Sequence, residues 1–105
     1  MSLLTKLKGD LFKALAHPTR IQILELLQQG ELCVCHIYEE LEQSQSNISQ
    51  HLSKLKKNQL VKSRKDGLKV YYSLRDRKVI EILELSKKLI LSQLDEVRDS
   101  LRKEG

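Results

Sequence analysis

Residues 36–58 have the sequence HIYEELEQSQSNISQHLSKLKKN, which predicts two short helices joined by a tight polar turn. In the second helix Ile48, Leu52 and Leu55 recur at the spacing of one apolar face. Ser44 stands just before this helix and suits its N-cap, because a hydroxyl there accepts a hydrogen bond from a free amide of the first turn. This pattern is typical of a helix-turn-helix, whose second helix enters the major groove of DNA by its N-terminus.

The outward face of the predicted second helix carries short or amide side chains and no carboxylate. Asn and Gln side chains can bridge the edge of adenine, and Ser can bond base edges or phosphates. The alternative is an ordinary solvated helix face. Because lysines and a basic hairpin come next in the chain, we predict DNA contacts from Gln45, Ser46, Asn47, Ser49, Gln50, His51 and Lys54.

A basic β-hairpin is predicted directly after this helix. The runs 61–65 and 69–74 favour strands, and Asp66-Gly67 between them is a strong hairpin signal. Behind a helix-turn-helix such a hairpin is typical of a wing, although edge lysines also simply prevent aggregation. We predict that the wing reaches phosphate or the minor groove through Arg64, Lys65 and Lys69.

Positive charge is concentrated in this part of the chain. The 105 residues have a formal net charge of +5, yet residues 54–78 alone contain ten Lys or Arg and two Asp. A localised basic patch indicates a polyanion as partner. A membrane surface is the other candidate, but the sequence has no apolar run of about 18 residues and no signal peptide. We therefore expect a soluble, cytoplasmic protein that binds double-stranded DNA and no membrane.

One amphipathic helix is predicted at each end of the chain, over residues 3–16 and 76–103. The leucine stripe of the last helix is longer than a small winged helix needs for its own core, so a partner should bury it. We predict a homodimer that places two recognition helices on a palindromic site. Its interface is expected to contain Leu4, Leu7, Leu11, Leu83, Ile90, Leu94 and Val97.

The expected fold is therefore one mainly α-helical domain over residues 1–105. Its parts are a helix-turn-helix at about 35–58, a wing at about 61–74, and the two dimerisation helices. A further helix begins at Pro18, a residue suited to the first helical position, and ends before Gly30. His17 precedes it and is interpreted as a cap or surface histidine, with a ligand or pH-sensing role as the alternative.

Cys33 and Cys35 lie where the first helix of the helix-turn-helix begins. Thiolates select soft metals and metalloids, and a helix N-terminus lowers the pKa of a thiol. Residues i and i+2 of a regular helix do not face each other, so both sulfurs can hold one ion only if this stretch is extended. An ion bound there would disturb the DNA-reading geometry.

These motifs together resemble the ArsR/SmtB winged-helix repressors over nearly the whole chain. The resemblance is carried by LAHPTRI (residues 15–21), ELCVC (31–35), SNISQHL (46–52) and KDG (65–67) followed by VYY (70–72). It implies a dimeric repressor of a resistance operon. That repressor leaves its operator when arsenite, antimonite or another thiophilic ion binds Cys33 and Cys35, and needs no organic cofactor.

The chain departs from the family's pattern at two places. The arsenic sensors that it most resembles have a third cysteine three residues after the second, where this chain has Tyr38. A non-protein ligand would complete a two-thiol site better than His36. The family's other metal site, on the last helix, needs histidines, and residues 76–103 contain none.

Three alternatives stay open for the two cysteines. The first is a redox regulator on the same fold, in which Cys33 and Cys35 close a disulfide or form a persulfide. The second is a winged helix that senses nothing and packs both cysteines as inert core residues. The third is a small thiol enzyme, which the sequence disfavours because it has no Cys-X-X-Cys, no βαβ pattern and no recognisable catalytic set. We expect no catalytic residue.

Overall fold

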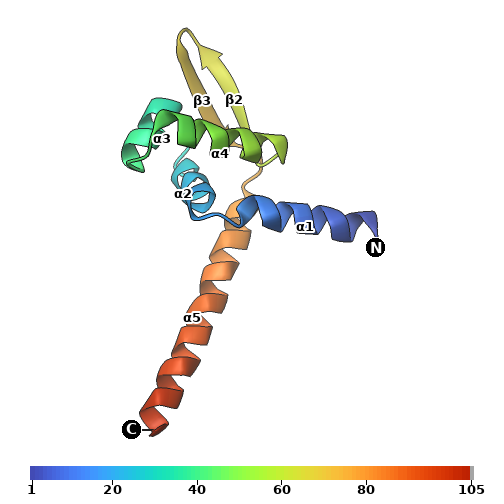
Figure 1. The fold of residues 1–105 in the computed structure, drawn as a ribbon, viewed down its shortest axis with the longest axis vertical. Coiled ribbons are helices and arrows are strands. Elements are labelled where there is room, and N and C mark those ends of the chain that lie inside the picture. Colours follow the sequence, from blue (N-terminus) through green and yellow to red (C-terminus); the bar gives the residue numbers. More distant parts are fainter. Residues whose placement is uncertain (105) are drawn as a thin grey trace.

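The computed structural model describes residues 1–104 as a small winged helix-turn-helix body with two projecting helices (Figure 1). The fold is mainly α-helical with a small β-wing, as predicted. The elements are α1 (Leu3–Leu15), α2 (Pro18–Leu27), β1 (Leu32–Cys33), α3 (Val34–Glu40), α4 (Gln45–Lys57), β2 (Val61–Asp66), β3 (Lys69–Leu74) and α5 (Lys78–Glu104).

Helix α2 forms the centre of the core, with α3 and α4 on one side and the start of α5 on another. The α4 stripe of Ile48, Leu52 and Leu55 is fully buried, which confirms the predicted inner face. The residues with the most deeply buried side chains are Ile23, Leu24, Leu27, Ile37, Ile48, Leu52, Leu55 and Val61.

Caps define where the central helices begin. Ser44 Oγ accepts a hydrogen bond from the Asn47 amide at 3.1 Å, as the sequence predicted. His17 caps α2, because its Nδ1 accepts a hydrogen bond from the Thr19 amide at 3.2 Å beside Pro18 in the first turn. The interpretation of His17 as a cap is therefore confirmed.

The wing contains one strand more than the sequence predicted. The sheet order is β1-β3-β2, all antiparallel, with Leu32 opposite Tyr72 and Cys33 opposite Tyr71. Strand β1 has two residues, too few for an alternating pattern, and it forms because β3 offers it a free edge. The turn lies at Gly67-Leu68 rather than Asp66-Gly67, since Asp66 pairs with Lys69 and Gly67 takes a positive φ of 64°.

Helices α1 and α5 extend away from the body in different directions, so the protein measures 61 × 38 × 21 Å (Figure 1). Only the start of α5, at Val79 and Ile80, is buried. Ile82 and Leu83 pack partly on the core, and the large apolar side chains from Leu85 onward face solvent. Within residues 1–104, the structure contains no helix with the length and apolarity to span a bilayer.

Candidate nucleic-acid interface and thiol pair

Helix α4 lies between the wing on one side and the α1–α2 junction on the other. Its N-terminal and outward residues Gln45, Ser46, Gln50 and Lys54 are exposed. Among the described residues these four side chains stay open to solvent, so a groove of DNA could reach them.

Three further α4 side chains that were predicted to contact DNA are half-buried and already have contacts. Asn47 donates a hydrogen bond from its amide to Gln43 Oε1, and Gln43 Nε2 donates to Thr19 Oγ1 at 3.0 Å. Thr19 is buried, so this chain of bonds fixes the turn of the helix-turn-helix onto α2. Ser49 instead faces the wing, where it lines the cavity beside the two cysteines.

His51 is held against the start of α2. Its Nδ1 accepts a hydrogen bond from Arg20 Nε at 3.2 Å, and its ring centroid lies 4.3 Å from that of His17. Burial and the neighbouring His17, Arg20 and Lys54 lower the pKa of His51 below its usual value of 6.5. The hydrogen bond to His51 orients the Arg20 side chain.

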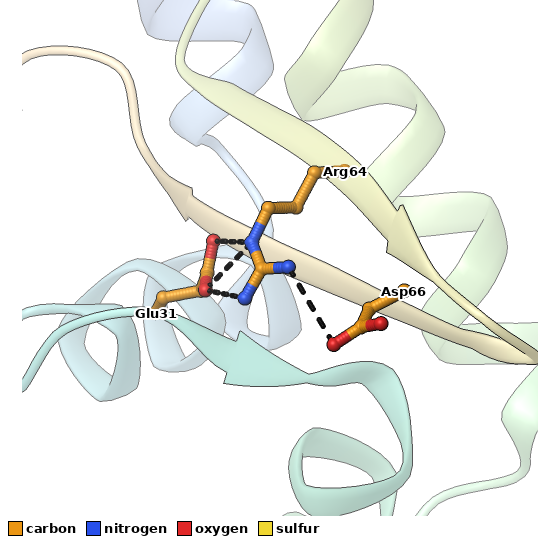
Figure 2. A network of polar contacts seen from close by, with 3 residues as sticks. All are labelled: Glu31, Arg64 and Asp66. Atoms are coloured by element: carbon orange, nitrogen blue, oxygen red, sulfur yellow. Dashed lines mark hydrogen bonds and ion pairs between the residues drawn. The ribbon is translucent and has the colours of Figure 1, made fainter.

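The wing presents Lys65 and Lys69 to solvent beside a fully exposed Leu68. Arg64, the third predicted wing contact, lies instead between two acidic side chains (Figure 2). It donates hydrogen bonds of 2.6–2.9 Å to Glu31, lies 4.0 Å from Asp66, and stacks on Tyr71 with its guanidinium carbon 4.7 Å from the ring centroid. The hydrogen bonds between Glu31 and Arg64 lower the pKa of the Glu31 carboxyl and raise the pKa of the Arg64 guanidinium.

Cys33 and Cys35 come together at the junction of β1 and α3. Cys33 is the extended N-cap of α3, with φ −66° and ψ 144°, and its Sγ accepts a hydrogen bond from the Cys35 amide at 3.3 Å. The two sulfurs are joined in a disulfide, with Cα atoms 5.2 Å apart. The extended backbone at Cys33 thus removes the difficulty that i and i+2 residues on a helix do not face each other.

The cysteine pair opens onto a cavity of about 280 Å³ that is walled by α4 and the wing. Gln45 and Ser49 of α4 form one wall, and Lys69, Val70 and Tyr72 of β3 form another, together with Leu68, Val34 and Tyr38. The described chain groups no three Cys, His, Asp or Glu side chains around a common point.

Most of the predicted interface residues are exposed on this single chain. Leu4, Leu7, Ile90, Leu94 and Val97 face solvent, whereas Leu11 and Leu83 pack partly on the core. The sequence reasoning missed a second apolar surface, a groove of about 650 Å³ between α1 and α5. The spacing of Ile82, Leu85 and Leu89 along one further face of the last helix was the signal; with Phe12, these side chains form its apolar wall.

Comparison with known proteins identifies the family. A family model for the bacterial regulatory proteins of the arsR family matches residues 17–63. The transcriptional regulator MJ1325 of Methanocaldococcus jannaschii is 46% identical over 78 residues, which cover 73% of this chain and 88% of that protein. The chain belongs to the ArsR family. The arsenical resistance operon repressor of Staphylococcus aureus is 39% identical, over 72% of this chain and 73% of the repressor.

Solved structures show the same fold over most of this ArsR-family chain. The crystal structure of Mycobacterium tuberculosis Rv0081 has a TM-score of 0.81 and 35% identity, covering 91% of this chain and 97% of that one. Reduced HlyU from Vibrio cholerae has a TM-score of 0.73 and 39% identity, covering 81% of this chain and 90% of that one. A homodimeric winged helix-turn-helix domain from Mycobacterium bovis has a TM-score of 0.74 and 32% identity, covering 83% of this chain and 81% of that one. This chain is accordingly a DNA-binding transcriptional regulator and not an enzyme.

Proposed function

We propose that this regulator is a homodimeric repressor that leaves a palindromic operator when arsenite, antimonite or another thiophilic ion binds Cys33 and Cys35. The observation that supports this best is the position of the thiols, in a cavity whose walls are the recognition helix and the wing. We expect the protein to act in the cytoplasm, where its DNA lies.

The cavity suggests how ion binding reaches the DNA. An ion on both sulfurs, with a ligand of its own, occupies space beside Gln45, Ser49 and Lys69. Those residues belong to the two elements that would sit on the operator, so their separation would change. A repressor needs only that the ion bind the DNA-free form better, by a coupling of about 1–3 kcal/mol.

The DNA contacts in this proposal come from α4 and the wing. Gln45, Ser46, Gln50, Lys54, Lys65 and Lys69 are exposed in the free protein. We also propose DNA contacts from Asn47, Ser49, His51 and Arg64. These side chains already contact other residues of the protein, so DNA would have to bind beside those contacts or replace them.

The homodimer is supported by the apolar surface of α1 and α5. Large exposed apolar patches are costly on a monomer and mark interaction sites. Leu94 and Val97 are 58% and 56% exposed on helix α5, and no other described element of this chain covers them. A relative of the same fold is a homodimeric DNA-binding domain.

A redox switch is the second candidate, and the disulfide between Cys33 and Cys35 favours it. In this case two thiols lose two electrons and two protons to an oxidant such as hydrogen peroxide, which becomes two molecules of water. One solved relative is a reduced form of HlyU. The DNA-reading elements and the cavity are common to both candidates.

Fluorescence anisotropy of the reduced protein on the palindromic DNA upstream of its own gene tests the proposal. Arsenite should release the wild type, while Cys33→Ser and Cys35→Ser should bind DNA and ignore arsenite. Release that a dithiol chelator reverses, and that a phosphine reductant does not, supports the ion. Release by peroxide that the phosphine reverses supports the redox switch. A Cys33→Ser protein that responds normally to both would contradict any role for the thiol pair.

A further inference from the structure

A basic pocket of about 420 Å³ lies where the last turn of α1 and the start of α2 meet the C-terminal part of α4. Lys13, Arg20, Lys54 and Lys57 line it, with Asp10 as its single carboxylate. Within residues 1–104, the ion pairs of the structure involve none of these five side chains. The pocket therefore has an excess of positive charge that is not neutralised by the protein itself.

Arg20 is held in position at the inner side of this pocket. Its Nη1 donates a hydrogen bond to the Ala14 carbonyl at 3.2 Å, and its Nε donates to His51 Nδ1 at 3.2 Å. These two bonds fix the plane of the guanidinium and leave Nη2 without a partner among the described residues. A guanidinium held in this way is suited to an oxyanion, especially a phosphate.

The pocket and the wing lie on opposite sides of α4. Lys56 faces the wing, where its Nζ donates a hydrogen bond to Ser63 Oγ at 2.7 Å. Ser49 lies about two helical turns before Lys56 on the same side of α4. His51 and Lys54 face the other side, toward Arg20 and the pocket. A helix in the major groove has a sugar-phosphate backbone on each side, and the wing occupies only one of them.

We propose that this pocket binds a backbone phosphodiester of the operator, on the side of α4 opposite the wing. Lys13, Arg20 and Lys57 are then phosphate ligands in addition to Lys54, and α1 takes part in DNA binding. Such contacts carry no base sequence but fix the register of the recognition helix on the duplex. This inference rests on the proposed operator binding and adds a second anchor to it.

The test measures DNA affinity over a series of salt concentrations for Lys13→Gln and Lys57→Gln. Each lost phosphate contact should reduce the slope of log affinity against log salt concentration by about 0.9. The reduction should be the same on operator and on unrelated duplex, because a phosphate contact is indifferent to sequence. Lys103→Gln, the control, removes the same charge near the far end of α5 and should leave the slope unchanged.

Lys13→Gln is the decisive variant, because Lys13 stands on α1, outside both the helix-turn-helix and the wing. It is exposed, so folding should be unaffected, and sedimentation checks that the variant has the wild-type oligomeric state. Ethylation interference should lose one phosphate position in this variant. If Lys13→Gln keeps the wild-type slope while Lys65→Gln in the wing lowers it, the inference is overturned and operator binding stands.

Two further outcomes separate the possible failures. If the wild-type protein binds operator no more tightly than unrelated duplex, and its DNA affinity does not depend on salt concentration, the proposed function is overturned and this inference with it. Competition by inorganic phosphate or nucleoside triphosphate that needs Lys13, with unchanged DNA binding by Lys13→Gln, would assign the pocket to a small phosphate ligand instead and overturn the DNA assignment.

Discussion

Arg64 of β2 holds the carboxylate of Glu31 with hydrogen bonds of 2.6–2.9 Å, and this pair joins the wing to the segment that carries the thiols (Figure 2). Glu31 directly precedes β1, and Cys33 is the last residue of that strand. Strand β1 also pairs with β3, so two different interactions connect the cysteines to the wing. A change at the thiols should therefore move the wing through Glu31 and Arg64.

Replacing Glu31 by Gln should weaken the response to the inducer more than it weakens DNA binding. The variant keeps the shape of the side chain but loses the charge that holds Arg64, while Arg64 stays available to phosphate. We expect the affinity of the reduced protein for DNA to be kept or raised. The ratio of affinities with and without inducer, expected at about 5–150-fold, should fall toward one.

Anisotropy titrations with and without arsenite or peroxide measure this ratio. Glu39→Gln is the matched control, since it removes the same charge from an exposed position on α3. A Glu31→Gln protein with the full wild-type ratio would show that the ion pair does not connect the two sites.

Stability should fall in mild acid because of His51. Its pKa is lowered in the folded protein by burial and by His17, Arg20 and Lys54, so the unfolded chain binds the proton more readily. The contribution of neutral His51 to the free energy of unfolding is therefore fully present above its unfolded pKa of about 6.5. It declines as the pH falls below that value toward the folded pKa. Urea unfolding from about pH 7 to about pH 5 measures this decline.

His51→Gln supplies the comparison, because an amide oxygen can accept the hydrogen bond from Arg20 without titrating. The decline should be smaller in this variant than in the wild type over the same pH range. His36 is unchanged in both proteins and His17 loses only its neighbour, so the difference reports His51 together with its contact to His17. Equal slopes in the two proteins would contradict the assignment.

The recognition helix could be predicted from the sequence because its determinants are local. The spacing of Ile48, Leu52 and Leu55 and the Ser44 cap all lie within one short stretch, and all were found as predicted. The Gly67 signal placed the hairpin correctly to within one residue. Such features need no knowledge of the rest of the fold.

Contacts between distant segments could not be predicted in this way. Arg64 and Glu31 are 33 residues apart, and Arg20 and His51 are 31 apart, so no periodicity connects them. His51 and Asn47 lie at the edge of the buried face of α4, where a polar side chain suits either solvent or a neighbouring helix. Only the packing of α2 against α4 decides that they are half-buried.

Two leucines at opposite extremes of burial provide a test of the core. Leu52 of α4 is 0% exposed and Leu68 at the wing tip is 105% exposed. Leu52→Ala should cost about 2–5 kcal/mol in the free energy of unfolding, because it leaves a cavity between α4 and α2. Leu68→Ala should change it by less than about 0.5 kcal/mol. Urea unfolding at one protein concentration compares them, and equal losses would contradict this packing of the core.

A single charge placed in the α5 stripe should separate the proposed dimer. Leu94 is 58% exposed on this chain, so Leu94→Glu is harmless to the monomer fold. At a dimer interface the same carboxylate would be buried without a partner, which is costly. Sedimentation velocity should then show a monomer, and operator affinity should fall by more than about tenfold because only one half-site is held at a time.

Arg102→Gln is the control for charge, since it shifts the net charge by the same amount from another face of the same helix. It should stay a dimer and bind the operator as the wild type does. Thermal unfolding shows whether Leu94→Glu has kept its winged-helix body, which α2, α3 and α4 build without this position. A Leu94→Glu protein that sediments as a dimer would move the interface away from the α5 stripe, and the groove beside Phe12 and Leu89 would be the next surface to test.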